Sequence, residues 1–295
     1  MVALDAVGMA TVAAGIWSLS MVVSKMGLES GGTTLQVSVI VAATDVVVYL
    51  LILGVTGQLG GMAAIPPAGI AAFVLAGVLG TALGRFASFA GIRRVGASIN
   101  SAVISARPLF ATVLAFAFIG ETVSLPVVGG IVVLVVGLAV LSLTRGGDIG
   151  GWEPVELIFP LAAGAAFAAA DVLRRWGLTT TGASPLQGVA VNEIAGVLLL
   201  GAYVFLARRE SFRNVSRRTY GLFLASGVLN SLSFLTFFMA LNLGPVAIGS
   251  SLIATTPLFT TVYAYFLLSD LERITPGVVV GAILVVIGAV TITIA

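Results

Sequence analysis

Ten apolar stretches divide this chain, and they restrict its fold more than any other feature. Each is about 20 residues long, which is enough for a helix to cross the hydrocarbon core of a bilayer. Lipid offers the backbone no hydrogen-bonding partners, so only helices and closed barrels span it. The predicted spanning helices cover residues 5–26, 36–56, 67–92, 97–119, 126–143, 155–174, 185–206, 219–243, 246–268 and 275–294.

The charge content also indicates a fold in lipid. Only 9% of the 295 residues are charged, against about 25% in a soluble domain. So few ionic groups cannot cover a water-facing surface. Residues 1–26 have no basic start and are predicted to be a spanning helix, not a signal peptide. We therefore expect an all-α, multi-pass integral membrane protein, located in the plasma membrane and surrounded by lipid.

The sequence repeats itself over a long interval, and such self-similarity reveals architecture. Residues 101–113 read SAVISARPLFATV, and residues 250–262 read SSLIATTPLFTTV, an offset of 149. At an offset of 151, further matches keep the same order: Glu121, Gly130 and Gly137 with Glu272, Gly281 and Gly288. The sequence predicts two related five-helix domains, residues 1–146 and 147–295.

The odd number of helices in each predicted domain determines their relative orientation. After five crossings the chain is on the other side of the membrane, so the second domain enters it inverted. Inverted repeats are typical of secondary transporters, in which the substrate binds near the midplane between the halves. The ten helices are therefore expected to form two inverted five-helix repeats that work by alternating access.

The doubled unit resembles the EamA-like family of the drug/metabolite transporter superfamily. Three segments carry the resemblance: the helix of Trp17 with its end at 25–28 (KMGL), residues 107–110 (RPLF) and residues 256–259 (TPLF). The resemblance implies a ten-helix permease for a small polar metabolite, such as an amino acid, or for a drug. Family members often have an arginine in the second helix of each half, whereas this chain has Asp45 and Glu193 there.

Charged residues deep in the predicted spans are the first candidates for the substrate pathway. A charge in hydrocarbon costs about 2.5–3.5 kcal/mol, so it is usually paired or faces water. Asp45 and Arg107 belong to the same half and are predicted to pair. Such a pair either fixes the helix register or lines a central cavity for a charged or zwitterionic substrate. Arg85 is a further candidate on the third predicted helix.

Glu193 has no obvious basic partner in its half apart from Arg174 and Arg175. One hypothesis is a carboxylate that couples export to protons, and the alternative is a carboxylate satisfied by Asn192, Asn230 or an arginine. Asn230 is therefore included among the pathway candidates. Asp171 and Arg174 lie three residues apart, which predicts local pairing near a helix end.

Two prolines inside predicted helices, Pro108 and Pro257, suggest kinks. Proline lacks an N–H and frees the carbonyl four residues earlier, so equivalent kinks in both halves suit gating elements. Thr255 and Thr256 precede the second proline as candidate substrate contacts, and Trp17 is a candidate for the cavity wall. The alternative is that the prolines only shape packing and that the threonines bond to their own helix.

Several classes of function lack the residues they require. The chain has no cysteine and no histidine, which removes thiolate and imidazole chemistry. We expect no metal site, cofactor, enzymatic activity or nucleic-acid partner. A channel, a non-transporting membrane protein and a membrane enzyme remain the alternatives to a transporter. Glycines spaced by seven, at 130/137 and 281/288, indicate scaffold helices or the face of a homodimer, and Glu121 and Glu272 are predicted to cap or pair.

Basic residues leave the orientation of the chain open. They favour the cytoplasmic side of a membrane. Ten of them follow odd-numbered predicted helices, and only Arg174 and Arg175 follow even-numbered ones. This places the N-terminus outside, whereas the family resemblance implies both termini in the cytoplasm.

Overall fold

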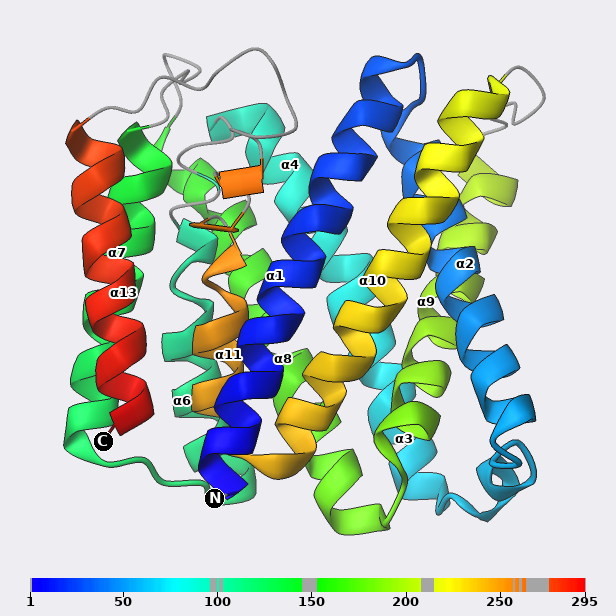
Figure 1. Cartoon of the computed structure of the whole chain (residues 1–295), viewed down its shortest axis with the longest axis horizontal. Helices are drawn as coiled ribbons and strands as arrows, with labels where there is room; N and C mark the ends of the chain where they lie inside the picture. The colour runs from blue at the N-terminus through cyan, green and yellow to red at the C-terminus, as the bar shows by residue number, and fades with distance from the viewer. Residues whose placement is uncertain are drawn as a thin grey trace.

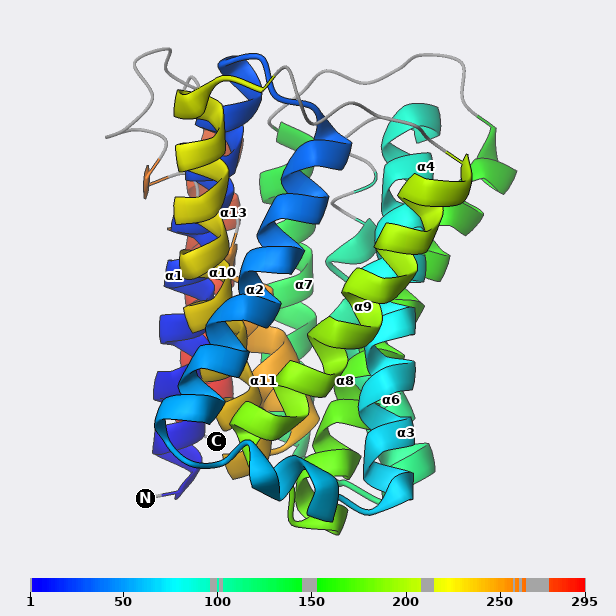
Figure 2. The same cartoon turned by 90° about the vertical axis from the view of Figure 1, so that its right-hand side faces the viewer.

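The computed structural model describes residues 2–95, 100, 103–144, 153–207, 215–256, 258–259, 262–263 and 276–294. All regular elements in these ranges are helices. They stand side by side in one bundle, with the start of α1 and the end of α13 at the same end (Figures 1 and 2), which we call the termini end. The α-helices are α1 (Val2–Glu29), α2 (Thr34–Val55), α3 (Pro67–Ala76), α4 (Arg85–Val95), α6 (Arg107–Ile119), α7 (Leu125–Thr144), α8 (Ile158–Thr181), α9 (Pro185–Ala207), α10 (Arg217–Leu243), α11 (Val246–Ile253) and α13 (Pro276–Ile294).

Six helices of the described part are long and apolar enough to cross a membrane: Asp5–Glu29, Leu35–Val55, Pro67–Ser88, Pro154–Thr181, Pro185–Leu206 and Arg217–Leu243. Shorter apolar helices occupy three other predicted spans. Large apolar side chains point outward along the bundle, such as Val55 at 89% exposure and Phe118 at 76%. An outer surface of this kind suits lipid.

Helices from the two predicted domains pack against each other in a regular pattern. α1 lies along α10, and α8, which opens the second domain, lies along α3. α2 contacts α9, and α7 contacts α13 (Figures 1 and 2). Each of these contacts joins elements from both domains, and the four buried apolar clusters of the described residues all draw side chains from both domains.

The glycines spaced by seven form the contact between α7 and α13. A Cβ on Gly137 would lie 2.9 Å from the carbonyl oxygen of Gly281, and one on Gly288 would lie 2.7 Å from that of Gly130. Only a helix face without side chains allows two backbones to approach so closely. This face is buried inside the molecule, so it is not available as the predicted face of a homodimer.

The third predicted span is interrupted by η2 (Gly77–Gly84), a π-helical segment between α3 and α4. π-helical turns often occur at functional sites because they change which side chains face the neighbouring helix. η2 presents Thr81 to the buried interior, and close contact with α9 depends on Gly77, whose Cβ would collide with the backbone oxygen of Asn192.

The fourth predicted span is broken, which corrects the expected kink at Pro108. The residue lies in the first turn of α6, where its missing N–H has no helical partner in any case. A turn precedes it, in which the N–H of Ala106 donates to the carbonyl of Val103 at 3.1 Å and that of Leu109 to Ala106 at 2.9 Å.

The same turn follows α11. The N–H of Thr255 donates to the carbonyl of Leu252 at 3.1 Å, and that of Leu258 to Thr255 at 2.9 Å. All donors and acceptors of the two turns lie 149 positions apart, at the offset of the sequence repeat. Both halves therefore interrupt the equivalent helix in the same way, while the predicted kink residue Pro257 lies outside the described residues.

Candidate functional site

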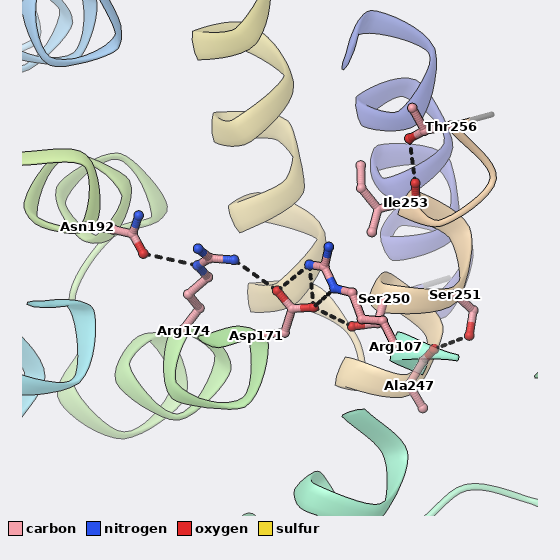
Figure 3. Close-up of polar contacts among 9 residues, drawn as sticks. All are labelled: Arg107, Asp171, Arg174, Asn192, Ala247, Ser250, Ser251, Ile253 and Thr256. Carbon is pink, nitrogen blue, oxygen red and sulfur yellow. Dashed lines mark hydrogen bonds and ion pairs between the residues drawn. The ribbon is translucent and has the colours of Figure 1, made fainter. Parts of the chain in front are cut away.

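The interior of the bundle holds a chain of charged side chains centred on Asp171 of α8 (Figure 3). Arg107, the first residue of α6, donates from Nη2 to both carboxylate oxygens of Asp171, at 2.7 and 2.6 Å, and from Nε at 2.9 Å. Arg174 donates from Nη1 at 2.9 Å, and Ser250 of α11 donates at 2.7 Å. Asp171 is fully buried, so one carboxylate ties together α6, α8 and α11.

The polar chain continues from Arg174 to α9. Nε of Arg174 donates to Asn192 at 3.0 Å, and the amide nitrogen of Asn192 donates to Oε1 of Glu193 at 2.8 Å. Thr81 of η2 donates to the same oxygen at 3.3 Å. The other oxygen, Oε2, is buried and has no hydrogen-bond partner among the residues that the structure describes. A buried carboxylate oxygen without a donor costs free energy. The series of hydrogen bonds therefore ends at an acceptor that can still bind a donor.

Asp45 forms a second buried cluster, between α2 and α10. Asn230 donates to one of its oxygens at 2.8 Å, and Ser231 donates to the other at 2.7 Å. Tyr49, one turn further on α2, donates to the backbone oxygen of Ser231 at 2.9 Å. The predicted pair between Asp45 and Arg107 is therefore wrong: neutral donors satisfy Asp45, and Arg107 binds an acid from the other half.

Arg85, the first residue of α4, is a further half-buried charge. It acts electrostatically on both Asp45 and Glu193. No hydrogen bond of its side chain occurs within the described part of the chain. Formal charges balance over the interior, with three acids (Asp45, Asp171, Glu193) and three arginines (Arg85, Arg107, Arg174). They are distributed unevenly, because two of the arginines, Arg107 and Arg174, share Asp171.

Aromatic rings cover the arginines of this site. Arg174 lies over Phe234 and Phe238, 5.4 and 5.6 Å from the ring centroids, and Arg107 lies 5.5 Å from the centroid of Phe167. Trp17 meets Phe234 edge to face at 5.6 Å. The structure thus brings Trp17 next to the charged chain, as a second layer behind Phe234.

Thr255 and Thr256, the predicted substrate contacts, use their hydroxyls in their own turn. Their hydroxyls donate to backbone carbonyls three residues back, those of Leu252 and Ile253, at 2.6 Å each. The carbonyl of Thr256 accepts from Ser18 of α1 at 2.8 Å. These threonines shape the turn after α11, and the first helix of the other half holds that turn.

Asp171 is the central residue that sequence reasoning missed. Its spacing from Arg174 predicts a local pair, and that contact does form. The missing step was that Arg107 needs a partner from the other half, because α8 packs beside α6. A count of the acids and arginines within the apolar stretches of both halves could have indicated that Arg107 pairs with an acid of the other half.

A second cross-domain contact lies at the termini end. Arg175 donates to Glu121 at 2.7 Å and to the carbonyls of Leu241 and Asn242 at 2.7 and 2.9 Å. Glu121 also accepts from the N–H of Val246 at 2.8 Å. The prediction that Glu121 caps or pairs is confirmed: it caps α11 while Arg175 caps α10. Its predicted counterpart Glu272 lies outside the described residues.

Within the described residues, no group of three or more acidic side chains is placed to hold a metal ion. The site is instead a mixed array of acids, guanidinium groups and hydroxyls.

Comparison with known proteins shows a family for this chain, a related sequence and a shared fold. The model of the EamA-like transporter family matches twice, over residues 5–143 and 155–294. A WAT1-related protein of Arabidopsis thaliana, described as chloroplastic, is 25% identical over 189 residues, which are 61% of this chain and 45% of that protein. A solved crystal structure of a protein matches with a TM-score of 0.79 over 98% of each chain at 17% identity, which shows a shared fold.

Proposed function

The chain belongs to the EamA-like transporter family, and from this premise we propose that it moves a small polar molecule by alternating access between two inverted five-helix repeats. The family and the apolar helices show that the chain is a multi-pass membrane protein and, broadly, a transporter. The substrate, the direction and the mechanism are our proposal. The domain boundary between residues 146 and 147 stays a prediction.

The packing of the helices supports the inverted arrangement of ten spans. A twofold axis in the membrane plane makes the equivalent helices of the two halves run antiparallel. Gly130 lies beside Ile292, and Gly137 lies beside Gly281, so α7 and α13 run antiparallel. Ser184 at the start of α9 bonds to Gln58 just after α2, which indicates the same relation for α2 and α9.

The buried charges between the halves are the observation that carries the proposal. A stable scaffold in lipid has no need of six ionisable side chains in its interior, because each is costly there. The acid-rich and arginine-rich parts of the site suit a substrate with both charges, and a zwitterion such as an amino acid is the class we propose. We assign Trp17, Asp45, Arg85, Arg107, Glu193 and Asn230 to the pathway.

Glu193 is the group to which we assign proton coupling. Its Oε2 is buried, and no described residue donates to it, so a proton or a substrate N–H can bind there without displacing a contact of the described structure. Protons entering as the substrate leaves would drive export across the plasma membrane.

Transport by the purified protein in liposomes tests this function. We expect counterflow of at least one labelled amino acid or metabolite from a broad panel, with loss of flux in Arg107→Ala and Asp45→Asn. Glu193→Gln should retain counterflow but lose the response to a pH gradient. Absence of flux for the whole panel would refute a transporter of this substrate class.

A further inference from the structure

The way Arg107 is held leaves one edge of its guanidinium group open. Nε and Nη2 are both directed at Asp171, with contacts of 2.6 to 2.9 Å. Nη1 makes no hydrogen bond within the described part of the chain, and Figure 3 shows this nitrogen without a contact. The side chain keeps 11% exposure, whereas that of Asp171 has none. Arg107 thus presents two unused N–H donors from a fixed position.

Fixation by Asp171 gives that edge a direction. A guanidinium group is planar and carries five donors in a rigid fork, so fixing one edge also fixes the other. The ring of Phe167, 5.5 Å from the guanidinium carbon, adds a wall on one side. A fixed cationic N–H donor forms a strong, charge-assisted hydrogen bond with an anionic oxygen, and a carboxylate supplies such an oxygen.

Asp171 also connects this edge to the other half. Its Oδ2 accepts from Arg107 and, at 2.7 Å, from Ser250. Arg107 follows the break before α6, and Ser250 lies one turn before the equivalent break after α11. Because Arg107 and Ser250 donate to the same oxygen of Asp171, a displacement of Arg107 is passed to Ser250 through that carboxylate.

We propose that Asp171 is a positioning residue of the transport site: it holds Arg107 so that Nη1 binds the carboxylate of the substrate, and it transmits this binding to α11 through Ser250. This inference rests on the proposed transport function and deepens it, because it assigns one end of the zwitterion to one side chain. It separates Asp171, which acts through Arg107, from Arg107, which touches the substrate.

Paired ligands test the assignment. Purified protein would be heated with leucine, serine or lysine and, separately, with the corresponding carboxamides leucinamide, serinamide and lysinamide. Binding to the folded state raises the apparent melting temperature in a concentration-dependent way. We expect the wild type to bind at least one amino acid with a tenfold higher apparent affinity than the corresponding carboxamide. Arg107→Ala should abolish that preference.

The variants of Asp171 distinguish positioning from mere stability. Asp171→Asn should weaken the apparent affinity for the amino acid at least tenfold and leave that for the carboxamide unchanged. Asp171→Glu keeps the charge but shifts the carboxylate by one methylene. It should reduce the preference for the amino acid over its carboxamide, and it provides the test if Asp171→Asn does not fold. Glu156→Gln changes a half-buried acid, far along the chain from the site and paired with the exposed Arg94 at 3.3 Å; it is the matched control and should behave as the wild type.

Ser250→Ala tests the link to α11, with unchanged affinity and slower counterflow as the expected result. Equal stabilisation by acid and carboxamide, no stabilisation by any of the acids, or an unchanged preference in both Asp171 variants would overturn the inference. Flux without a carboxylate preference would leave the transporter standing and refute only the role of Asp171. Carboxylate binding at Arg107 without flux would support the role of Asp171 and refute the transport function.

Discussion

At the scale of single residues, the interior treats its acids in two ways. Asp171 is neutralised by arginines, whereas Asp45 is surrounded by neutral donors, with Asn230 and Ser231 at 2.8 and 2.7 Å. Hydrogen bonds to a charged group are stronger than those between neutral groups. Each donor to Asp45 is therefore expected to contribute more to stability than an ordinary buried hydroxyl.

Two serines on α10 allow a direct comparison. Ser231 donates to Asp45, whereas Ser233 donates to the backbone oxygen of Ala13 at 2.8 Å, and both are fully buried. Ser231→Ala should lower the free energy of unfolding by about 1–3 kcal/mol, against about 0.5–1.5 kcal/mol for Ser233→Ala. Apparent melting temperatures in detergent measure the difference, and a larger loss for Ser233→Ala would contradict the charge-assisted role.

The sequence identified Asp45, Arg107 and Glu193 as buried charges, but neither the burial of Asp171 and Arg174 nor the groups that these charges meet. Burial of Arg107 and Glu193 follows from their place within apolar stretches, because a spanning helix leaves them no route to water. Their partners depend on which helices become neighbours. Asp45 and Arg107 were predicted to pair because they share a half, yet the helices of the two halves interleave and bring Asp171 to Arg107 instead.

At the scale of helices, glycine allows two long helices to touch through their backbones. α7 and α13 touch through their backbones, where a Cβ on Gly137 would lie 2.6 Å from the backbone nitrogen of Val285. Backbone atoms cannot rotate away, so the two helices would have to separate along much of their length. The period of seven predicted such a face, but not that its partner was the matching face of the other half.

Gly137→Ala should therefore destabilise the protein by about 1–3 kcal/mol, the usual cost of overpacking. Gly129→Ala on the same helix is the matched control, because its Cβ would meet nothing within 4 Å. Replacing an unconstrained helical glycine by alanine stabilises a helix by roughly 0.5–1 kcal/mol. Thermal unfolding of both variants in detergent checks this, and equal losses would refute the close contact.

The turn between α10 and α11 is the second helix-scale feature. Arg175 and Glu121 have side chains only 18% and 17% exposed and together cap both helices. Arg175→Ala should cost about 1–3 kcal/mol, because it leaves Glu121 and two carbonyls without their donor. Arg94→Ala, which removes a pair that is 51% and 24% exposed, should cost only about 0–1 kcal/mol. Similar melting temperatures for the two variants would show that the caps do not stabilise the turn.

At the scale of the whole molecule, lipid accounts for what was predictable. Helices had to form wherever about 20 apolar residues follow one another, because a bilayer leaves the backbone no alternative. The interruptions were not predictable in this way. η2 and the turn before α6 lie within apolar stretches that read as continuous helices, and the buried partners that hold them come from distant segments.

Orientation in the membrane is the remaining whole-molecule question, and the structure sharpens it. Arg174 and Arg175 were the basic residues assigned to the termini side, yet Arg174 is buried at 3% exposure and Arg175 binds Glu121. Neither is a free loop charge. Lys25, by contrast, is 57% exposed near the opposite end of α1. The charge rule therefore favours a cytoplasmic location for that opposite end more strongly than the sequence alone did.

Single cysteines measure this directly, because the chain has no thiol of its own. Thr56, exposed just after α2, marks the termini end, and Lys25 marks the other (Figure 1). If positive charge sets the orientation, an impermeant maleimide added to intact cells should label Thr56→Cys and not Lys25→Cys, and both should react after lysis. Both substitutions remove exposed contacts: that of Lys25 with Glu29 at 3.9 Å and the hydrogen bonds of Thr56 with Ile52 and Gln58, at 2.7 and 3.3 Å. Labelling of Lys25→Cys alone in intact cells would place both termini in the cytoplasm, as the family resemblance implies, and the basic loops would then face outward against the charge rule.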